Sequence, residues 1–156
     1  MLNIVIPGFK PLQLLHLLLD YNGTLAAQGH LVEGVAPALQ SLSKKLKLHV
    51  ITGDTFGSAR NELAGLDCQL LILPSEDQAT AKLHYLQQLP SDQTVAIGNG
   101  RNDQYMLKQA ALGIAVIGPE GAAIEAMQSA NLVVSHILHA LGLLEQPRRL
   151  VATLRC

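Results

Sequence analysis

Four short polar segments of the sequence contain the residue types that phosphoryl transfer requires. Each follows an apolar run or lies in the helix before one, and their key residues are Asp20, Thr52, Lys82 and the segment 98–103. A carboxylate can attack phosphorus to form an acyl-phosphate, which divides one difficult reaction into two easier steps. A nearby hydroxyl and ammonium group would bind and neutralise phosphoryl oxygens. Asp20 is therefore a candidate nucleophile, with Thr52 and Lys82 as candidate partners, although each segment alone also fits a turn or a helix cap.

The elements that must position these residues follow an alternating pattern. Short runs of leucine, isoleucine and valine alternate with amphipathic segments, which is typical of βαβ units on a parallel sheet covered by helices on both faces. The expected strands are Leu14–Leu19, Leu46–Ile51, Gln69–Leu73, Thr94–Ile97, Gly113–Ile117 and Leu132–Val134, with Leu2–Ile6 as an additional edge strand. The expected helices are Val35–Lys45, Thr55–Ala64, Asp77–Gln88, Asp103–Ala111, Gly121–Ser129 and Ser135–Leu144, and a last helix starts at Pro147. We predict one α/β domain over residues 1–156, with the polar segments meeting at the carboxyl ends of the strands.

Taken together, the four segments resemble the motifs of the haloacid dehalogenase (HAD) superfamily of phosphotransferases. DYNGTL begins at Asp20, ITGD ends at Asp54, Lys82 follows, and GNGRND begins at Gly98, which is the order found in that superfamily. The sequence is most similar to the phosphorylation domains of P-type ATPases and their soluble relatives. The resemblance implies a three-layer Rossmann-like (HAD-like) fold and a phosphatase or phosphotransferase that works through an aspartyl-phosphate on Asp20.

The resemblance also assigns residues to the metal and to the phosphate. It implies Mg²⁺ bound by the Asp20 carboxylate, the Asn22 backbone carbonyl and the Asn99 side chain, with Asp103 as a nearby support. These are the oxygen donors that this hard cation prefers. The catalytic set that it implies is Asp20, Asn22, Thr52, Lys82 and Asp103. The phosphate-binding set that it implies is Gly23, Thr24, Gly53 and Asn102.

Two residues depart from the superfamily pattern. Asn22 stands where most of its phosphatases have an aspartate that acts as general acid and base, and an amide cannot shuttle a proton. Because general acid–base help is worth about 10²–10⁴ in rate, we expect slow hydrolysis or a protein that holds a phosphoryl group. Asn99 stands where an aspartate usually binds the metal, so we expect weak Mg²⁺ binding unless Asp54 or Asp103 compensates.

The spacing of the motifs also predicts the kind of partner. The segments between the motifs have room for a short hairpin turning near Gln28 and Gly29 but not for a cap domain. An open site suits a phosphorylated macromolecule, or a phosphorylated small molecule in a site closed by a second copy of the chain in a homo-oligomer.

Composition excludes several other classes of protein. The net charge is −1, only 3% of residues are aromatic, and 49% are hydrophobic, which argues against a nucleic-acid-binding surface and for a large buried core. No apolar run is long enough to cross a membrane, and Cys68 and Cys156 form no CxxC pair, so we expect a cytoplasmic protein without a membrane partner. His136 and His139 lack a third ligand at a zinc-like spacing.

Two other classes of protein share parts of this pattern. A non-catalytic module on the same fold, which binds phosphate or a protein partner, is favoured by Asn22 and Asn99. A receiver domain of two-component signalling also has aspartate, threonine and lysine at strand ends, but its phosphorylated aspartate follows the third strand. Asp20 follows the first predicted strand of the sheet, so we discount the receiver domain.

Overall fold

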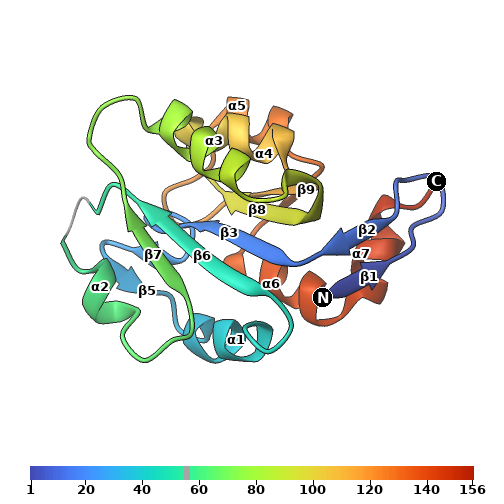
Figure 1. Ribbon diagram of the computed structural model, residues 1–156, viewed down its shortest axis with the longest axis horizontal. Coiled ribbons are helices and arrows are strands. Elements are labelled where there is room, and N and C mark those ends of the chain that lie inside the picture. The colour runs from blue at the N-terminus through green and yellow to red at the C-terminus, as the bar shows by residue number, and fades with distance from the viewer. Residues whose placement is uncertain (55–56) are drawn as a thin grey trace.

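Six parallel strands form the central sheet of the chain in a computed structural model that describes residues 1–54 and 57–156 (Figure 1). The spatial order is β10-β9-β8-β3-β6-β7, and every neighbouring pair is parallel. The strands are β3 (His16–Asp20), β6 (Lys47–Thr52), β7 (Gln69–Ile72), β8 (Thr94–Gly98), β9 (Leu112–Val116) and β10 (Leu132–Val134). The predicted α/β class with a parallel sheet is confirmed.

Helices cover both faces of this sheet, as the continuous apolar strands require (Figure 1). Alternate residues of β3 point to opposite faces, so Leu18 belongs to one buried core while Leu17 and Leu19 belong to the other. The face of Leu18 is covered by α3 (Gln78–Gln88), α4 (Gln104–Gln109) and α5 (Ile124–Ser129). The opposite face is covered by α1 (Val35–Leu42), α6 (Ile137–Glu145) and α7 (Pro147–Leu154). The three-layer arrangement follows from these two cores.

The N-terminal region differs from the prediction. Leu2–Ile6 was expected as an edge strand of the main sheet, but β1 (Leu2–Ile4) pairs antiparallel with β2 (Leu12–Leu14) in a separate two-stranded sheet. The predicted strand Leu14–Leu19 is divided at Leu15, which bonds instead to Gln93 and Lys47. The apolar run is continuous in sequence, but its first half has an antiparallel partner and its second half has parallel ones.

The short connecting elements complete the chain. A hairpin of β4 (Ala26–Ala27) and β5 (His30–Leu31) turns at Gln28 and Gly29, both with positive φ, at the position predicted for the flap. The predicted helix Thr55–Ala64 is shorter: α2 spans Ala59–Glu62, and residues 55 and 56 lie outside the described part of the chain. Two 3₁₀ turns, η1 (Ser91–Gln93) and η2 (Arg101–Asp103), precede β8 and α4. In the described ranges, no helix has the length and apolar character that crossing a bilayer requires.

Candidate active site

Asp20 is the last residue of β3, at the carboxyl edge of the sheet, and it is only 6% exposed. Its Oδ1 accepts a hydrogen bond from Lys82 Nζ at 2.6 Å, and its Oδ2 accepts one from the Thr24 hydroxyl at 3.1 Å. The strand fixes the backbone of Asp20, and these two contacts fix its carboxylate. Residues 62 positions apart in sequence therefore form one buried ion pair.

Lys82 projects from α3 and binds a second carboxylate, that of Asp103. Its Nζ also donates to Asp103 Oδ1 at 2.6 Å, and the exposed fractions of Lys82 and Asp103 are 1% and 0%. The other Asp103 oxygen accepts the backbone N–H groups of Asn99 at 3.0 Å and Gly100 at 2.8 Å. Residue 98 must be small here, since a Cβ on Gly98 would lie 2.5 Å from Asp103 Cγ. Asp103 thus holds Lys82 in place and joins the loop after β8 to α3.

Two carboxylates share one ammonium group, which sets the electrostatics of the site. Burial and the neighbouring charge of Asp103 raise the pKa of Asp20 to about 6, although Lys82 and Thr24 act in the opposite direction. The pKa of Lys82 is raised above its usual value because the attraction of Asp20 and Asp103 outweighs the effect of burial. The cluster therefore has two acidic groups for one basic group.

The loop after β3 turns sharply at Gly23, which has a φ of +79°. A side chain there would be strained, and a Cβ would also lie 2.5 Å from Asn99 Nδ2. The next residue, Thr24, is 1% exposed, and its hydroxyl lies 3.1 Å from both Asp20 Oδ2 and Asn99 Oδ1. The side chain of Thr24, a predicted phosphate-binding residue, thus faces these two residues and joins Asp20 to Asn99.

Thr52 ends β6 beside Asp20, as predicted, and Asn22 lies across from it. The Thr52 hydroxyl oxygen accepts the backbone N–H of Asp54 at 2.9 Å and lies 3.5 Å from Asn22 Nδ2. Asn22 Oδ1 is buried and, among the described residues, has no hydrogen-bond partner. Because a buried acceptor without a partner costs about 1–3 kcal/mol, this atom indicates that a further donor or cation belongs in the site.

A hollow of about 220 Å³ opens at this edge of the sheet. Six of the predicted residues line it: Asp20, Asn22, Thr52, Gly53, Asn99 and Asn102. The other predicted residues, Gly23, Thr24, Lys82 and Asp103, are buried behind these six. The ends of β3, β6 and β8, together with α3, bring both sets of residues to this edge of the sheet.

Sequence reasoning missed two lining residues, Gln78 and Glu120, whereas Gly100 lies in the predicted segment 98–103. Gln78 begins α3, and its amide lies so close to Gly53 that a Cβ there would be 2.3 Å from Gln78 Nε2. It also accepts a hydrogen bond from Asn102 at 2.9 Å. Glu120 follows β9, and its position after a strand of the parallel sheet is the feature of the sequence that could have indicated a place in the site.

A metal at this site would need oxygen donors beyond acidic side chains. Among the described residues, no group of three or more His, Cys, Asp or Glu side chains is placed to hold a metal ion. The oxygen donors at the hollow include the carboxylates of Asp20 and Glu120 and the side-chain amides of Asn22 and Asn99. Mg²⁺ usually binds through one or two carboxylates and retains several waters, so this donor set fits Mg²⁺ and not a thiolate or imidazole metal.

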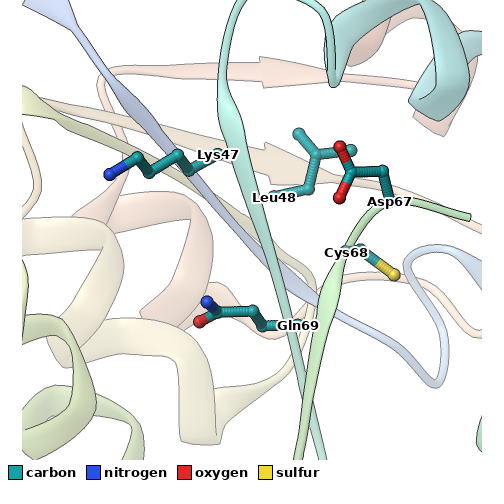
Figure 2. Close-up of a pocket in the computed structure, with 5 residues that line it drawn as sticks. All are labelled: Lys47, Leu48, Asp67, Cys68 and Gln69. Atoms are coloured by element: carbon teal, nitrogen blue, oxygen red, sulfur yellow. The ribbon is translucent and has the colours of Figure 1, made fainter.

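A second hollow lies at the opposite edge of the sheet, where β6 begins and the chain enters β7. Lys47, Leu48, Asp67, Cys68 and Gln69 line it, and no predicted site residue is among them (Figure 2). Burial raises the pKa of the Cys68 thiol, which disfavours the reactive thiolate. This hollow has neither the nucleophile nor the phosphate-binding groups of the first.

Comparisons with known proteins identify a matching family profile and several similar sequences. The sequence profile of haloacid dehalogenase-like hydrolases matches residues 77–136, which contain Lys82 and the segment 98–103. An uncharacterized protein of Methanocaldococcus jannaschii is 48% identical over 79 residues, which cover 48% of this chain and 85% of that protein. A probable copper-exporting P-type ATPase of Archaeoglobus fulgidus is 35% identical over 106 residues, which cover 67% of this chain but only 13% of the ATPase.

A solved structure is similar over almost the whole chain. It is the 3-deoxy-D-manno-octulosonate 8-phosphate phosphatase of Moraxella catarrhalis in complex with a magnesium ion, a phosphate ion and a KDO molecule, with a TM-score of 0.69. The match covers 92% of this chain and 94% of that one at 18% identity. At this identity the similarity shows the fold alone.

Proposed function

Because the chain belongs to the haloacid dehalogenase superfamily, we propose that it is a phosphatase or phosphotransferase in which Asp20 becomes phosphorylated. The observation that carries this proposal is the position of the Asp20 carboxylate. It lines an open hollow, is held by Lys82 at 2.6 Å, and lies beside Thr52. The proposal treats residues 1–156 as one catalytic domain.

The proposed reaction has two steps. In the first, an Asp20 oxygen forms a bond to phosphorus while the bond from phosphorus to the substrate's ester oxygen breaks, and that oxygen takes a proton from solvent. In the second, water attacks phosphorus, gives its proton to solvent and releases phosphate, which restores the carboxylate. Transfer to another hydroxyl in place of water would make the protein a phosphotransferase.

The other residues would stabilise the charge of the transferring group. Two donors face the Thr52 oxygen, from Asp54 and Asn22, so its own proton is left to donate to a phosphoryl oxygen. Lys82 holds Asp20 in place and provides positive charge behind it. Gly53 lets a substrate approach the backbone closely.

Magnesium fits this site on two observations. The cluster has two carboxylates for one ammonium, and Asn22 Oδ1 is a buried acceptor without a partner among the described residues. Asp20, Asn99 and the backbone carbonyl of Asn22 would hold the ion. When bound, Mg²⁺ would neutralise the charge of the phosphoryl group.

Asn22 makes the proposed hydrolysis slow. An amide at this position can orient a leaving group or a water molecule by hydrogen bonding, but it cannot exchange a proton with either. The phosphorylated enzyme should therefore persist. The substrate we propose is a phosphorylated small molecule, the class named for the structurally similar enzyme from Moraxella catarrhalis.

The test is phosphate release from a panel of sugar, amino-acid and nucleotide phosphates with Mg²⁺ present. We expect slow turnover and an acyl-phosphate that hydroxylamine cleaves, both abolished in Asp20→Asn. The control Asp92→Asn changes an exposed aspartate in the turn before β8 and should act as wild type. Equal turnover in wild type and Asp20→Asn would refute the proposed role of Asp20.

A non-catalytic binding module is the second candidate, favoured by the amides at positions 22 and 99. Asn22→Asp separates the two functions. If the site is catalytic, this change supplies a proton donor and raises hydrolysis about 10²-fold or more. If Asn22→Asp together with Asn99→Asp stays inert while phosphate still binds, the binding module is the correct assignment.

A further inference from the structure

Glu120 lies in a tight turn that contacts the site, in the loop that follows β9. The turn closes through a hydrogen bond from Gly121 N to Gly118 O at 2.9 Å, and Gly121 has a φ of +76°. Two hydrogen bonds tie this region to Asn99. Asn99 Nδ2 donates to Gly121 O at 3.1 Å, and Asn99 O accepts the backbone N–H of Ala123 at 2.8 Å.

The turn also packs directly against the loop that follows Asp20. A Cβ on Gly118 would lie 2.7 Å from the carbonyl oxygen of Gly23, so the two backbones touch. A Cβ on Gly23 would lie 2.8 Å from Glu120 Oε2 and 2.9 Å from Asn99 Oδ1. A carboxylate oxygen and an amide oxygen therefore approach the same point, in the space that two glycines leave open.

No ion pair among the described residues uses Glu120, although it is charged and lines the hollow. Glu125, five residues later, differs in this respect because it pairs with Arg101 at 3.1 Å. The Glu120 carboxylate is held near Asn99 by the turn, not by a cation of the protein. Its charge is available to a ligand in the hollow.

We propose that Glu120 supplies the second carboxylate of the magnesium site, directly or through a bound water. This inference rests on the proposed function, which places Mg²⁺ between Asp20 and Asn99. Asn99 contributes an oxygen without a full charge, and Mg²⁺ sites in proteins commonly use one or two carboxylates. Glu120, reaching in from a different loop, would restore the negative charge that an aspartate at position 99 would have provided.

The experiment measures Mg²⁺ binding by calorimetry on the full chain without substrate, so that the result does not depend on turnover. We expect Glu120→Gln to weaken Mg²⁺ binding by about tenfold or more, the range found when groups around a metal site are removed. Glu125→Gln is the matched control and should bind Mg²⁺ as wild type does. Asn99→Asp added to Glu120→Gln should recover the lost affinity, because it returns a carboxylate to the same point.

The outcomes separate this inference from the proposed function. If wild type and Glu120→Gln bind Mg²⁺ equally, Glu120 is not part of the site, and the role of Asp20 is unaffected. If wild type binds no Mg²⁺, the inference also fails. If chelator-treated wild type still releases phosphate, the magnesium part of the proposed function fails with it. Thermal unfolding of each variant without metal identifies any change caused by misfolding.

Discussion

Replacing Lys82 with methionine should destabilise the folded chain strongly, whatever its catalytic role. Methionine has a similar length and can occupy the same space in α3, so the change removes a charge more than it removes volume. It leaves Asp20 and Asp103, 6% and 0% exposed, without the ammonium group that each contacts at 2.6 Å. Removing one partner of a buried ion pair typically costs about 3–5 kcal/mol. For a chain of this size that cost lowers the melting temperature by roughly 8–16 °C.

The destabilisation should depend on pH in a direction that the structure specifies. The pKa of Asp20 is already raised to about 6, and removing the nearby positive charge raises it further. The folded variant then binds protons that the unfolded chain, with its lower carboxylate pKa, releases. Its stability therefore increases as the pH falls from 7 toward 5. Adding Asp103→Asn to Lys82→Met removes one of the two stranded charges and should recover part of the loss.

The assay is urea denaturation followed by circular dichroism at pH 7 and pH 5. Lys108→Met, an exposed lysine on α4, serves as the control and should change the free energy of unfolding by less than about 0.5 kcal/mol. The reasoning is refuted if Lys82→Met costs no more than this control. It is also refuted if, on acidification from pH 7 to pH 5, Lys82→Met loses as much stability as wild type does.

Three further changes test the packing and the buried polar groups. Gly113→Ala should lower the free energy of unfolding by about 1–3 kcal/mol or more, because its Cβ would lie 2.2 Å from the backbone oxygen of Leu107. Chemical denaturation measures this loss, and an unchanged denaturation midpoint would contradict the close approach of the two backbones. Gly142→Ala in α6 should instead raise the free energy of unfolding by up to about 1 kcal/mol, because alanine favours a helix and its Cβ would meet only a side-chain nitrogen of Arg149 at 4.0 Å. A loss of stability in the same assay would show a clash that the structure lacks. Burial is the main cause that lowers the pKa of His49 in the folded chain to about 4. As the pH falls, His49 is therefore protonated in the unfolded chain before it is protonated in the folded one, and the free energy of unfolding should decrease between about pH 6.5 and pH 4. His49→Gln should weaken this decrease while the exposed His84→Gln retains it, and identical pH profiles for the two variants would rule out His49 as a cause.

The strands of the sheet could be predicted because their burial on both faces leaves a strong local signal. Predicted strands such as Thr94–Ile97 and Leu132–Val134 differ from β8 and β10 by at most one residue at an end. The N-terminal region could not be assigned in this way. The run through Leu15 is rich in leucine on either side, and the choice of partner divides β2 from β3.

Polar residues outside the motifs were harder to predict for a similar reason. His16 Nδ1 lies 2.9 Å from His49 Nε2, and His49 Nδ1 lies 2.9 Å from the Tyr85 hydroxyl. The two histidines occupy neighbouring strands, and Tyr85 lies on α3. Their pairing depends on strand register and helix placement, neither of which is encoded locally.

The sequence by itself determined that Asp20, Thr52 and the segment 98–103 belong to one edge of one sheet. That conclusion needs only strand order along the chain and the rule that parallel strands end at a common edge, whereas Lys82 lies in a helix and was added by the family resemblance. The tertiary structure decided what each group contacts: Lys82 is shared by two carboxylates, and Thr24 faces Asp20 and Asn99. It also decided that Glu120 reaches the same hollow, because contact between two loops depends on backbone packing and not on the spacing of residues in the chain.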